Sequence, residues 1–179
     1  MVWGVLPEMP KIETSRVSGH GTELKGKATY LYKGGEGYAE IYENDSFGGK
    51  SYYSDSVSEN DGKGYIVLNA DFDNKKISGS AAYNLYGTRD NRNEVKRQVE
   101  LTFKDTSLYK GSDHLKFNGE ATGKLLSKDL KEELSGSYSG DISSNGKGTS
   151  LHYNIYTQGR NIKVTSRNGF SDSVYLHKQ

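Results

Sequence analysis

The sequence predicts an all-β protein: an antiparallel up-and-down β-barrel of about eight strands, with a small tyrosine-rich strand and loop flap. Apolar residues recur at every second position in at least eight runs between Ala28 and Leu176. Each run ends in Gly, Asn, Asp or Ser, and the chain holds 22 Gly but only 2 Pro. Alternation with a period of two indicates strands with one buried and one wet face, so the sheet is antiparallel and closes or stacks around one core.

The strongest alternation lies beyond residue 64, where the chain reads as a meander of hairpins. Asp73–Lys75 is expected to be a short turn, and Gly87–Asn91 a longer exposed loop. Ser127 followed by Asp129–Leu134 suggests one helical fragment. Further strands are expected near 150–156, 161–166 and 172–177. The residues predicted to face the interior are Ile66, Leu68, Ala70, Phe72, Ile77, Gly79, Ala81, Tyr83, Leu85, Val99, Leu101, Phe103, Leu115, Phe117, Gly119, Ala121, Leu134, Gly136, Tyr138, Gly140, Ile142, Leu151, Tyr153 and Ile155.

The chain divides into a short leading part and one barrel domain. Residues 1–25 read as an N-terminal tail or short strand, with strand character around Lys11–Val17. Residues 26–179 form the barrel domain, and Gly26–Tyr32 is its first strand. Alternation is weak from 33 to 63, where two short strands (about 37–43 and 50–56) are expected to form the flap.

Composition limits what such a barrel can hold. Only 32% of the residues are hydrophobic, yet 14 Tyr and 5 Phe are present among 179 residues. A tyrosine ring can fill a core while its hydroxyl finds a polar partner, so aromatic mass replaces missing aliphatic side chains. A small barrel filled in this way has little room for an interior site, and its specificity lies on loops and the outer face.

Several classes of function are excluded by charge and residue usage. A net charge of +1 gives no field that favours nucleic acid, and zero Cys excludes disulfides and thiolate metal sites. No apolar run approaches the roughly 18 residues of a membrane-spanning helix. Gly136–Gly140 has Tyr where a hydrolase elbow needs Ser, and Asn145–Ser150 lacks the spacing of a phosphate loop. With no nucleophile–base pair, carboxylate pair or metal triad, the chain is predicted not to be an enzyme.

Four motifs, in order, give the chain a resemblance to a known family. They are G-x-A-x-Y at Gly26–Tyr30, DF followed by K-x-I-x-G at Ala70–Gly79, F-x-G-x-A at Phe117–Ala121, and L-x-G-x-Y-x-G at Leu134–Gly140. This pattern resembles the eight-stranded barrels of transferrin-binding protein B, and is similar to those of factor H-binding protein, neisserial heparin-binding antigen and the secreted hemophilins. Tyr138 stands where the family favours Phe, and Ser143–Gly148 replaces its usual A-x-E-x-x-G.

The resemblance implies a localisation and a general task. It implies an extracellular protein, or one on the outer-membrane surface of a Gram-negative bacterium, that captures a host molecule, frequently for iron or haem uptake. The implied partners are haem or a host carrier of haem or iron, and a bacterial outer-membrane receptor. No membrane-spanning segment is expected.

The four histidines offer the main chemistry. His152 and His177 alternate out of phase with their apolar neighbours and are expected to point to solvent. His20 and His114 lie in Gly-, Ser- and Asp-containing loops just before strands, and loops at a barrel rim can present an imidazole to haem iron. For each of them, an ordinary surface residue is the more common explanation of a loop histidine. The flap contributes flat amphipathic rings suited to a porphyrin or a protein epitope: Tyr38, Tyr42, Tyr52 and Tyr53.

The leading hypothesis is therefore a haem-binding, hemophore-like protein, with His20 or His114 as iron ligand and the flap tyrosines closing over the ring. The alternative is a surface receptor or adhesin that binds a host protein such as a complement regulator, transferrin or globin. A third reading, glycosaminoglycan binding, rests on the basic cluster Arg89, Arg92, Lys96 and Arg97, which interspersed acidic residues make better suited to a solvated loop.

Overall fold

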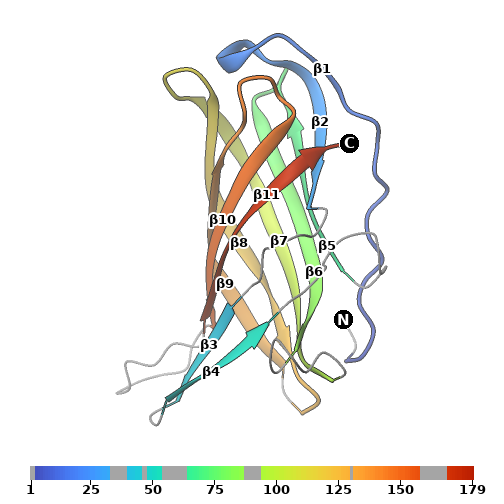
Figure 1. Cartoon of the computed structure of the whole chain (residues 1–179), viewed down its shortest axis with the longest axis vertical. Helices are drawn as coiled ribbons and strands as arrows, with labels where there is room; N and C mark the ends of the chain where they lie inside the picture. Colours follow the sequence, from blue (N-terminus) through green and yellow to red (C-terminus); the bar gives the residue numbers. More distant parts are fainter. Residues whose placement is uncertain are drawn as a thin grey trace.

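The computed structural model describes residues 3–32, 40–45, 48–53, 64–86, 94–129, 131–157 and 169–179. For residues 40–45, 48–53, 96, 157 and 169–172 the description covers the backbone alone. Strands make up almost all of the regular structure in these ranges, and a single 3₁₀ turn at Gly21–Glu23 is the one helical element in them (Figure 1). No helix in the described ranges is long and apolar enough to cross a membrane.

Eleven strands are formed in the described ranges, and their lengths increase toward the middle of the chain. The longest covers 16 residues. The strands are β1 (Arg16–Ser18), β2 (Lys25–Leu31), β3 (Glu40–Asp45), β4 (Gly48–Tyr53), β5 (Tyr65–Asp71), β6 (Lys76–Tyr86), β7 (Val95–Lys110), β8 (Leu115–Leu126), β9 (Lys131–Asp141), β10 (Gly148–Thr157) and β11 (Gly169–Lys178).

The predicted barrel is confirmed as a closed, antiparallel ring of eight strands: β2 and β5 to β11. Each strand pairs with the next from β5 to β11, and β2 pairs with both β5 and β11. The closing contact is short, with His177 opposite Leu31 and Lys178 opposite Tyr30. The backbone N–H of Gln179 then donates to the carbonyl oxygen of Thr29 over 2.9 Å, which extends the closure by one residue.

The two remaining parts of the sheet lie at opposite ends of β2. β1 pairs with Lys25–Lys27 at its start, outside the ring. β3 and β4 form the expected hairpin of the flap, and they bridge β11 and β6 at the lower end of the barrel in Figure 1, through Tyr42 opposite Gly169 and Tyr53 opposite Tyr86. By its backbone pairing, the flap prolongs the wall rather than standing apart from it.

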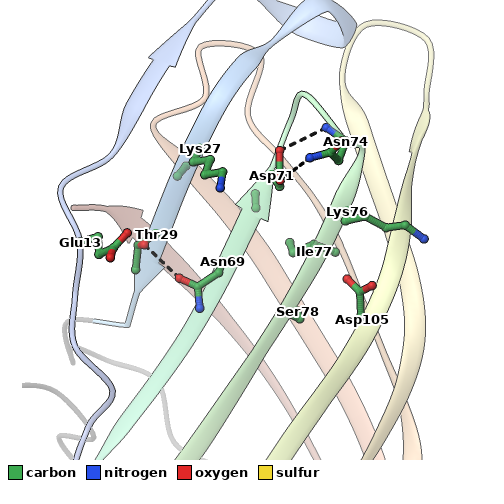
Figure 2. A pocket seen from close by; sticks show the side chains of 12 residues that line it. Glu13, Lys27, Thr29, Asn69, Asp71, Asn74, Lys76, Ile77, Ser78 and Asp105 are labelled. Carbon is green, nitrogen blue, oxygen red and sulfur yellow. Dashed lines mark hydrogen bonds between the residues drawn. The ribbon is translucent and has the colours of Figure 1, made fainter.

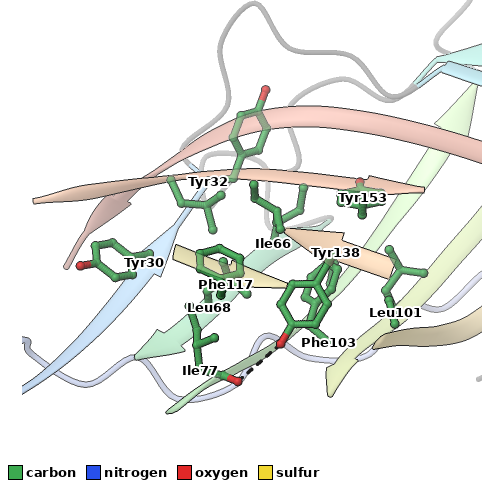
Figure 3. Close-up of a cluster of buried hydrophobic side chains, with 14 of the residues drawn as sticks. Tyr30, Tyr32, Ile66, Leu68, Ile77, Leu101, Phe103, Phe117, Tyr138 and Tyr153 are labelled. Atoms are coloured by element: carbon green, nitrogen blue, oxygen red, sulfur yellow. Dashed lines mark hydrogen bonds between the residues drawn. The ribbon is translucent and has the colours of Figure 1, made fainter. Parts of the chain in front are cut away.

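Aromatic side chains fill the interior, as the composition indicates (Figure 3). The ring of Phe103 lies 5.0 Å from that of Tyr138 and 5.7 Å from that of Tyr153, measured between centroids. The hydroxyls of Tyr83 and Tyr153 meet at 2.6 Å, so these buried polar atoms satisfy each other. Every non-glycine residue predicted to face the interior is buried.

Small residues within the strand motifs make room for these rings. A Cβ placed on Gly119 would lie 2.7 Å from Cε1 of Tyr138 and 3.0 Å from Cβ of Thr106. Gly119 therefore belongs to the F-x-G-x-A motif because the ring of Tyr138 occupies the space that a side chain would need.

The N-terminal part is more than a tail. Leu6 and Ile12 pack on the outside of the barrel against four buried residues that belong to no interior position: Leu31, Tyr65, Val67 and Ala82. We call the outer faces of β2, β5 and β6 the covered wall, and the outer faces of β10 and β11 the bare wall. The chain runs along the covered wall from its lower end up to β1 (Figure 1).

Polar contacts fix the N-terminal segment at both ends. The backbone N–H of Gly4 donates to Oε1 of Gln98 over 2.8 Å, and Gln98, which is 1% exposed, donates in turn to Oδ1 of Asn84. Farther along, the backbone N–H of Ser15 donates to the carbonyl oxygen of Gln179. The strand expected around Lys11–Val17 is shorter than predicted: Arg16–Ser18 (β1) pair with β2 through the backbone, whereas Ser15 contacts the backbone of Thr29 through its hydroxyl.

The helical fragment expected over Asp129–Leu134 is wrong. β9 begins at Lys131, and Leu134 lies opposite Gly123 and is buried in the core. The capping pattern was outweighed by the period-two alignment of Leu134 with Gly136 and Tyr138, which needs an extended backbone. The strands expected near 150–156 and 172–177 are confirmed as β10 and β11, whereas 161–166 lies outside the described residues.

Candidate functional site

The loops that carry His20 and His114 lie at the same end of the barrel. We call this end the upper rim; it consists of Gly21–Glu23 and the turns at 72–75, 111–114 and 143–147. The backbone N–H of Gly21 donates to the carbonyl oxygen of Ser144 over 2.7 Å, and Oγ of Ser144 donates to the carbonyl oxygen of Asp113 over 3.1 Å. These contacts tie three segments that are far apart in the sequence into one surface.

Glycine is needed where these segments meet. Gly21 has φ of +63°, in the left-handed region, and a Cβ there would lie 2.9 Å from the carbonyl oxygen of Asp113. The turn that follows His20 can therefore approach the β7–β8 turn only because residue 21 has no side chain.

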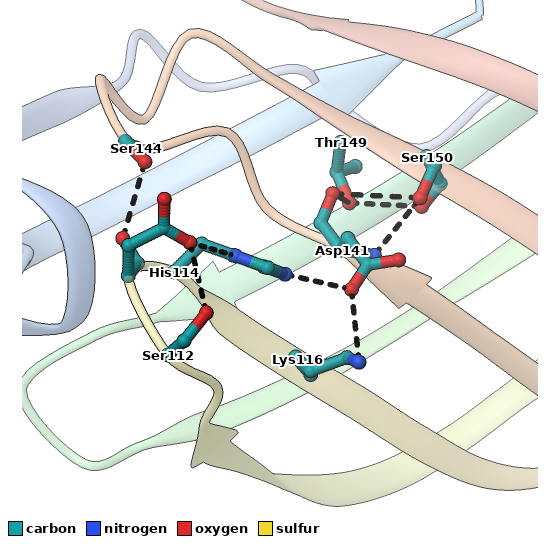
Figure 4. A network of polar contacts seen from close by, with 8 residues as sticks. Ser112, His114, Lys116, Asp141, Ser144, Thr149 and Ser150 are labelled. Atoms are coloured by element: carbon teal, nitrogen blue, oxygen red, sulfur yellow. Dashed lines mark hydrogen bonds and ion pairs between the residues drawn. The ribbon is translucent and has the colours of Figure 1, made fainter.

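His114 is held between two carboxylates at this rim (Figure 4). Its Nδ1 lies 2.7 Å from Oδ1 of Asp113, and its Nε2 lies 2.9 Å from Oδ1 of Asp141. The ammonium of Lys116 lies 3.6 Å from the same oxygen of Asp141. The side chain of His114 is 28% exposed, and both of its ring nitrogens are engaged, so neither has a lone pair directed at an iron atom.

The electrostatics of this cluster favour a charged imidazolium. The hydrogen bonds from Asp113 and Asp141 raise the pKa of His114 above its ordinary value of 6.5, and burial opposes them only in part. The same contact lowers the pKa of Asp113 below 3.8. A doubly hydrogen-bonded imidazolium is a structural link between the β7–β8 turn and the end of β9.

His20 is different, because its imidazole is exposed and is given no partner within the described part of the chain. It precedes the 3₁₀ turn, makes no capping hydrogen bond with its side chain, and has an extended backbone with φ of −153°. Of the two histidines predicted to bind iron, only His20 has ring nitrogens that are available to a ligand in the described structure, because both nitrogens of His114 contact carboxylates.

The flap tyrosines are not brought to this rim. Tyr42, Tyr52 and Tyr53 belong to β3 and β4, whose backbones lie at the opposite end of the barrel, beside the start of β11 and the end of β6. Tyr38 lies outside the described residues. A single site built from both histidines and the flap, as the sequence suggested, is therefore not assembled in the described structure.

The basic cluster is only partly described. Arg89 and Arg92 lie outside the described residues, and the side chain of Lys96 is not described. Arg97 is half-buried on β7 opposite Leu85 and has an interaction of its own. The described residues therefore do not present this cluster as one basic surface.

Two further surfaces were missed at the sequence level. The bare wall carries exposed aromatic rings: Tyr156 is 40% exposed and Tyr175 is 47% exposed, with Tyr175 edge-on to His177 at 5.3 Å between centroids. The covered wall holds a polar groove at its upper end (Figure 2). The sequence signal for both surfaces lies in the outward-facing residues of these strands.

Among the described residues no group of three or more His, Cys, Asp or Glu side chains is arranged to hold a metal ion. Comparison with protein-family models, curated proteins and solved structures finds no match to this chain. The likeness to the transferrin-binding protein B barrels therefore rests on the four sequence motifs and remains a resemblance.

Proposed function

We propose that this chain is a non-enzymatic binding protein that works at the exterior of a Gram-negative bacterium and captures its ligand with outer surfaces. The observation that supports this is the filled interior: four tyrosines and three phenylalanines, each less than 2% exposed, occupy the inside of the ring. Among the described residues, inward side chains packed to this degree leave no room for a ligand between them. Binding then falls to the rims and outer walls.

Haem is the first ligand to test, with the exposed imidazole of His20 as its axial iron ligand. A haem iron needs one such nitrogen lone pair, and His114 is unsuited to supply it because both of its nitrogens are engaged. The apolar residues nearest to His20 in the chain, Val17 and Leu24, pack into the core, so the porphyrin would lie against the upper rim and stay largely open to solvent.

Titration with haemin tests this version of the function. The account predicts a saturable shift of the Soret band in the native protein, its loss in His20→Ala, and its retention in His114→Gln. A spectrum that does not saturate, or a shift that survives His20→Ala, contradicts haem binding at this rim. Loss of the shift in His114→Gln alone would show that the axial ligand is assigned to the wrong histidine.

A second candidate is capture of a host protein, which the exposed aromatic rings of the bare wall favour. Aromatic residues are enriched at protein interfaces because they bury a large area at low entropic cost. Tyr156 and Tyr175 lie on neighbouring strands of one face, and no residue of the N-terminal segment covers them in the described structure.

Binding measured against purified transferrin, globin and a complement regulator separates this candidate from the first. If the bare wall carries the contact, the double variant Tyr156→Ala/Tyr175→Ala weakens binding by roughly tenfold or more. Tyr109→Ala is the matched control, since Tyr109 is 48% exposed on β7, away from the bare wall. If the native protein, the double variant and Tyr109→Ala all bind a partner equally well, or if the native protein binds none of the partners, capture of a host protein by the bare wall is contradicted.

A further inference from the structure

A polar groove of about 470 Å³ crosses the upper part of the covered wall (Figure 2). The N-terminal segment forms one side of the groove and β7 forms the other. Its floor is the backbone of β2, β5 and β6, because Ala28, Ala70 and Ile77 turn their side chains to the core. Pockets of 300–1,000 Å³ are the usual size for small-molecule sites.

Five chain segments supply polar side chains to this groove. Glu13 comes from the N-terminal segment, Lys27 from β2, Asn69 from β5, Ser78 from β6 and Asp105 from β7. Lys27, Asn69 and Ser78 stand at outward positions, each next to a core residue of its strand, and Asp105 is exposed on β7. The groove is therefore a meeting point of residues that are distant in the sequence, 92 positions apart at the extreme.

An irregularity of β7 places Asp105 here. The pairing of β7 with β6 shifts register between Ile77 and Gly79, and its pairing with β8 shifts between Phe103 and Leu108. From the interior, the hydroxyl of Tyr138 donates to the carbonyl oxygen of Lys104 at the same point. Bulges of this kind redirect side chains and are frequent beside functional sites.

Some of the polar groups in the groove are already matched, and others are not. Oδ2 of Asp71 accepts from Nδ2 of Asn74 over 2.8 Å, and the ammonium of Lys76 turns away to Oγ of Ser107. In contrast, the side chains of Lys27, Asp105 and Glu13 make no hydrogen bond or close ion pair within the described ranges, although Lys27 stands opposite Asp71 and helps to lower the pKa of its carboxyl. The amide oxygen of Asn69 accepts from Oγ1 of Thr29, which leaves its NH₂ group free to donate.

This mixture of charges limits the ligand. Carboxylates at both sides of the groove disfavour a polyanion, and Lys27 disfavours a polycation. A peptide strand finds no free edge, because β5 and β6 are each paired on both sides at this level. An uncharged ligand whose groups both donate and accept hydrogen bonds is complementary to this mixture.

We propose that the groove between the N-terminal segment and β7 binds a short, hydroxyl-rich saccharide. Asp105 and Glu13 accept hydrogen bonds from sugar hydroxyls, while Lys27 and the NH₂ group of Asn69 donate to sugar oxygens. Hydroxyl groups serve in both directions, as this set of donors and acceptors requires. The groove reaches the upper rim at Asn74 but includes neither His20 nor any residue of the bare wall, so this proposal can be tested independently of haem or host-protein binding.

Amide NMR spectra of the full chain, recorded during titration with neutral sugars, test the proposal. The probes are a glucose trimer, an N-acetylglucosamine trimer and lactose, each raised to tens of millimolar. The expected result is saturable shifts with at least one sugar at the amides of Asn69, Ser78 and Asp105. Asp105→Asn should weaken the binding of that sugar by roughly tenfold or more, because a hydrogen bond to a charged group is lost.

Matched variants decide the outcome. Glu120→Gln removes the same charge from an exposed position on β8, where Glu120 pairs with Lys104 outside the groove, and should leave sugar binding unchanged. Asn69→Ala is a second variant of the groove at an exposed position; because it also removes the hydrogen bond from Thr29, its amide spectrum is first checked for the native fold. The proposal is overturned if no sugar gives saturable shifts, or if Asp105→Asn and Asn69→Ala bind as the native protein does.

Discussion

The covered wall and the bare wall belong to one barrel, yet they meet solvent in different ways. On the covered wall, Val67 and Ala82 point outward and are at most 1% exposed, because the N-terminal segment lies over them. On the bare wall, Tyr156 and Tyr175 point outward and remain 40% and 47% exposed. The outward-facing residues of a strand are thus apolar where another segment covers them, just as the inward-facing residues are apolar because they form the core.

Removing residues 1 to 14 is the strongest way to test this comparison. We expect the free energy of unfolding to fall by about 2–3 kcal/mol, since apolar area at roughly 25 cal/mol per Å² returns to water and the entropy of ordering the segment offsets much of that loss. Chemical denaturation measures the change. The truncated chain should also bind a dye specific for apolar surface, and a truncated chain as stable as the native one would contradict the account.

A lysine in place of Val67 sharpens the same comparison. Because the lysine ammonium must reach water, we expect it to displace the N-terminal segment. Val67→Lys should therefore lower the free energy of unfolding by about 2 kcal/mol, which is no more than the loss caused by deleting the segment. In the truncated chain the same substitution should cost less than about 0.5 kcal/mol. Tyr175→Lys on the bare wall is the control, with an effect within about 0.5 kcal/mol in either background. Equal costs of Val67→Lys in both backgrounds would show that Val67 is not covered by this segment.

The contact of Gln98 with the N-terminal segment gives a test with a smaller expected effect on stability. Gln98→Ala removes an amide that accepts from Gly4 and donates to Asn84, so we expect a loss of about 1 kcal/mol in thermal or chemical unfolding. His152 on the bare wall makes a similar number of contacts, to Ser173 over 2.6 Å and to Asn154 over 3.0 Å, but it is exposed. His152→Ala should therefore change stability by less than about 0.5 kcal/mol, and the reverse order of effects would contradict the comparison.

The smallest expected effect is the pH dependence of the rim contact that joins the β7–β8 turn to β9. Since the pKa of His114 is raised on folding, its contribution is full below the unfolded value of 6.5 and is lost as pH rises through the folded pKa. The lowered pKa of Asp113 gives a contribution that is present above 3.8 and lost as pH falls through its folded pKa. The link is thus strongest between pH 3.8 and 6.5, and it weakens as pH rises from 6.5 through the raised pKa of His114.

NMR titration of the histidine side chains measures this directly. In the native protein His114 should titrate above 6.5, and in Asp141→Asn its midpoint should move down because one carboxylate partner becomes a neutral amide. A midpoint of His114 that is the same in both proteins would show that the contact does not persist in solution.

The sequence predicted the inside of this protein well. The set Ile66, Leu68, Ala70 and Phe72 is buried as expected, because one apolar face per strand is enough to fix which residues fill a closed ring. The same stretch held a second signal: Tyr65 and Val67 make the run 65–68 apolar on both faces. A strand of that kind is buried on both sides, and this pointed to a cover for the outer wall.

The site was harder to predict, because it depends on which turns meet. Nothing in the spacing of His114 and Asp141 shows that they lie 2.9 Å apart, since the contact arises from the register of β8 with β9. The grouping of His20 with the flap tyrosines failed for the same reason. His20 lies in the loop before β2, and Tyr42, Tyr52 and Tyr53 lie in the β3–β4 hairpin; strand direction decides at which end of the barrel each segment emerges.

Labelling of single cysteines tests the central claim, a filled interior with a covered and a bare exterior, most directly. The chain has no native Cys, so a maleimide reports only on the position chosen. Ala121 faces inward and is 1% exposed, Glu120 faces outward with 78% side-chain exposure, and Ala82 faces outward beneath the N-terminal segment at 0%.

The account predicts fast labelling of Glu120→Cys, and labelling of Ala121→Cys only through global unfolding. Ala82→Cys should be protected in the full chain and should react quickly once residues 1 to 14 are removed. If Ala121→Cys reacts as fast as Glu120→Cys, the interior is open to solvent and the account is contradicted.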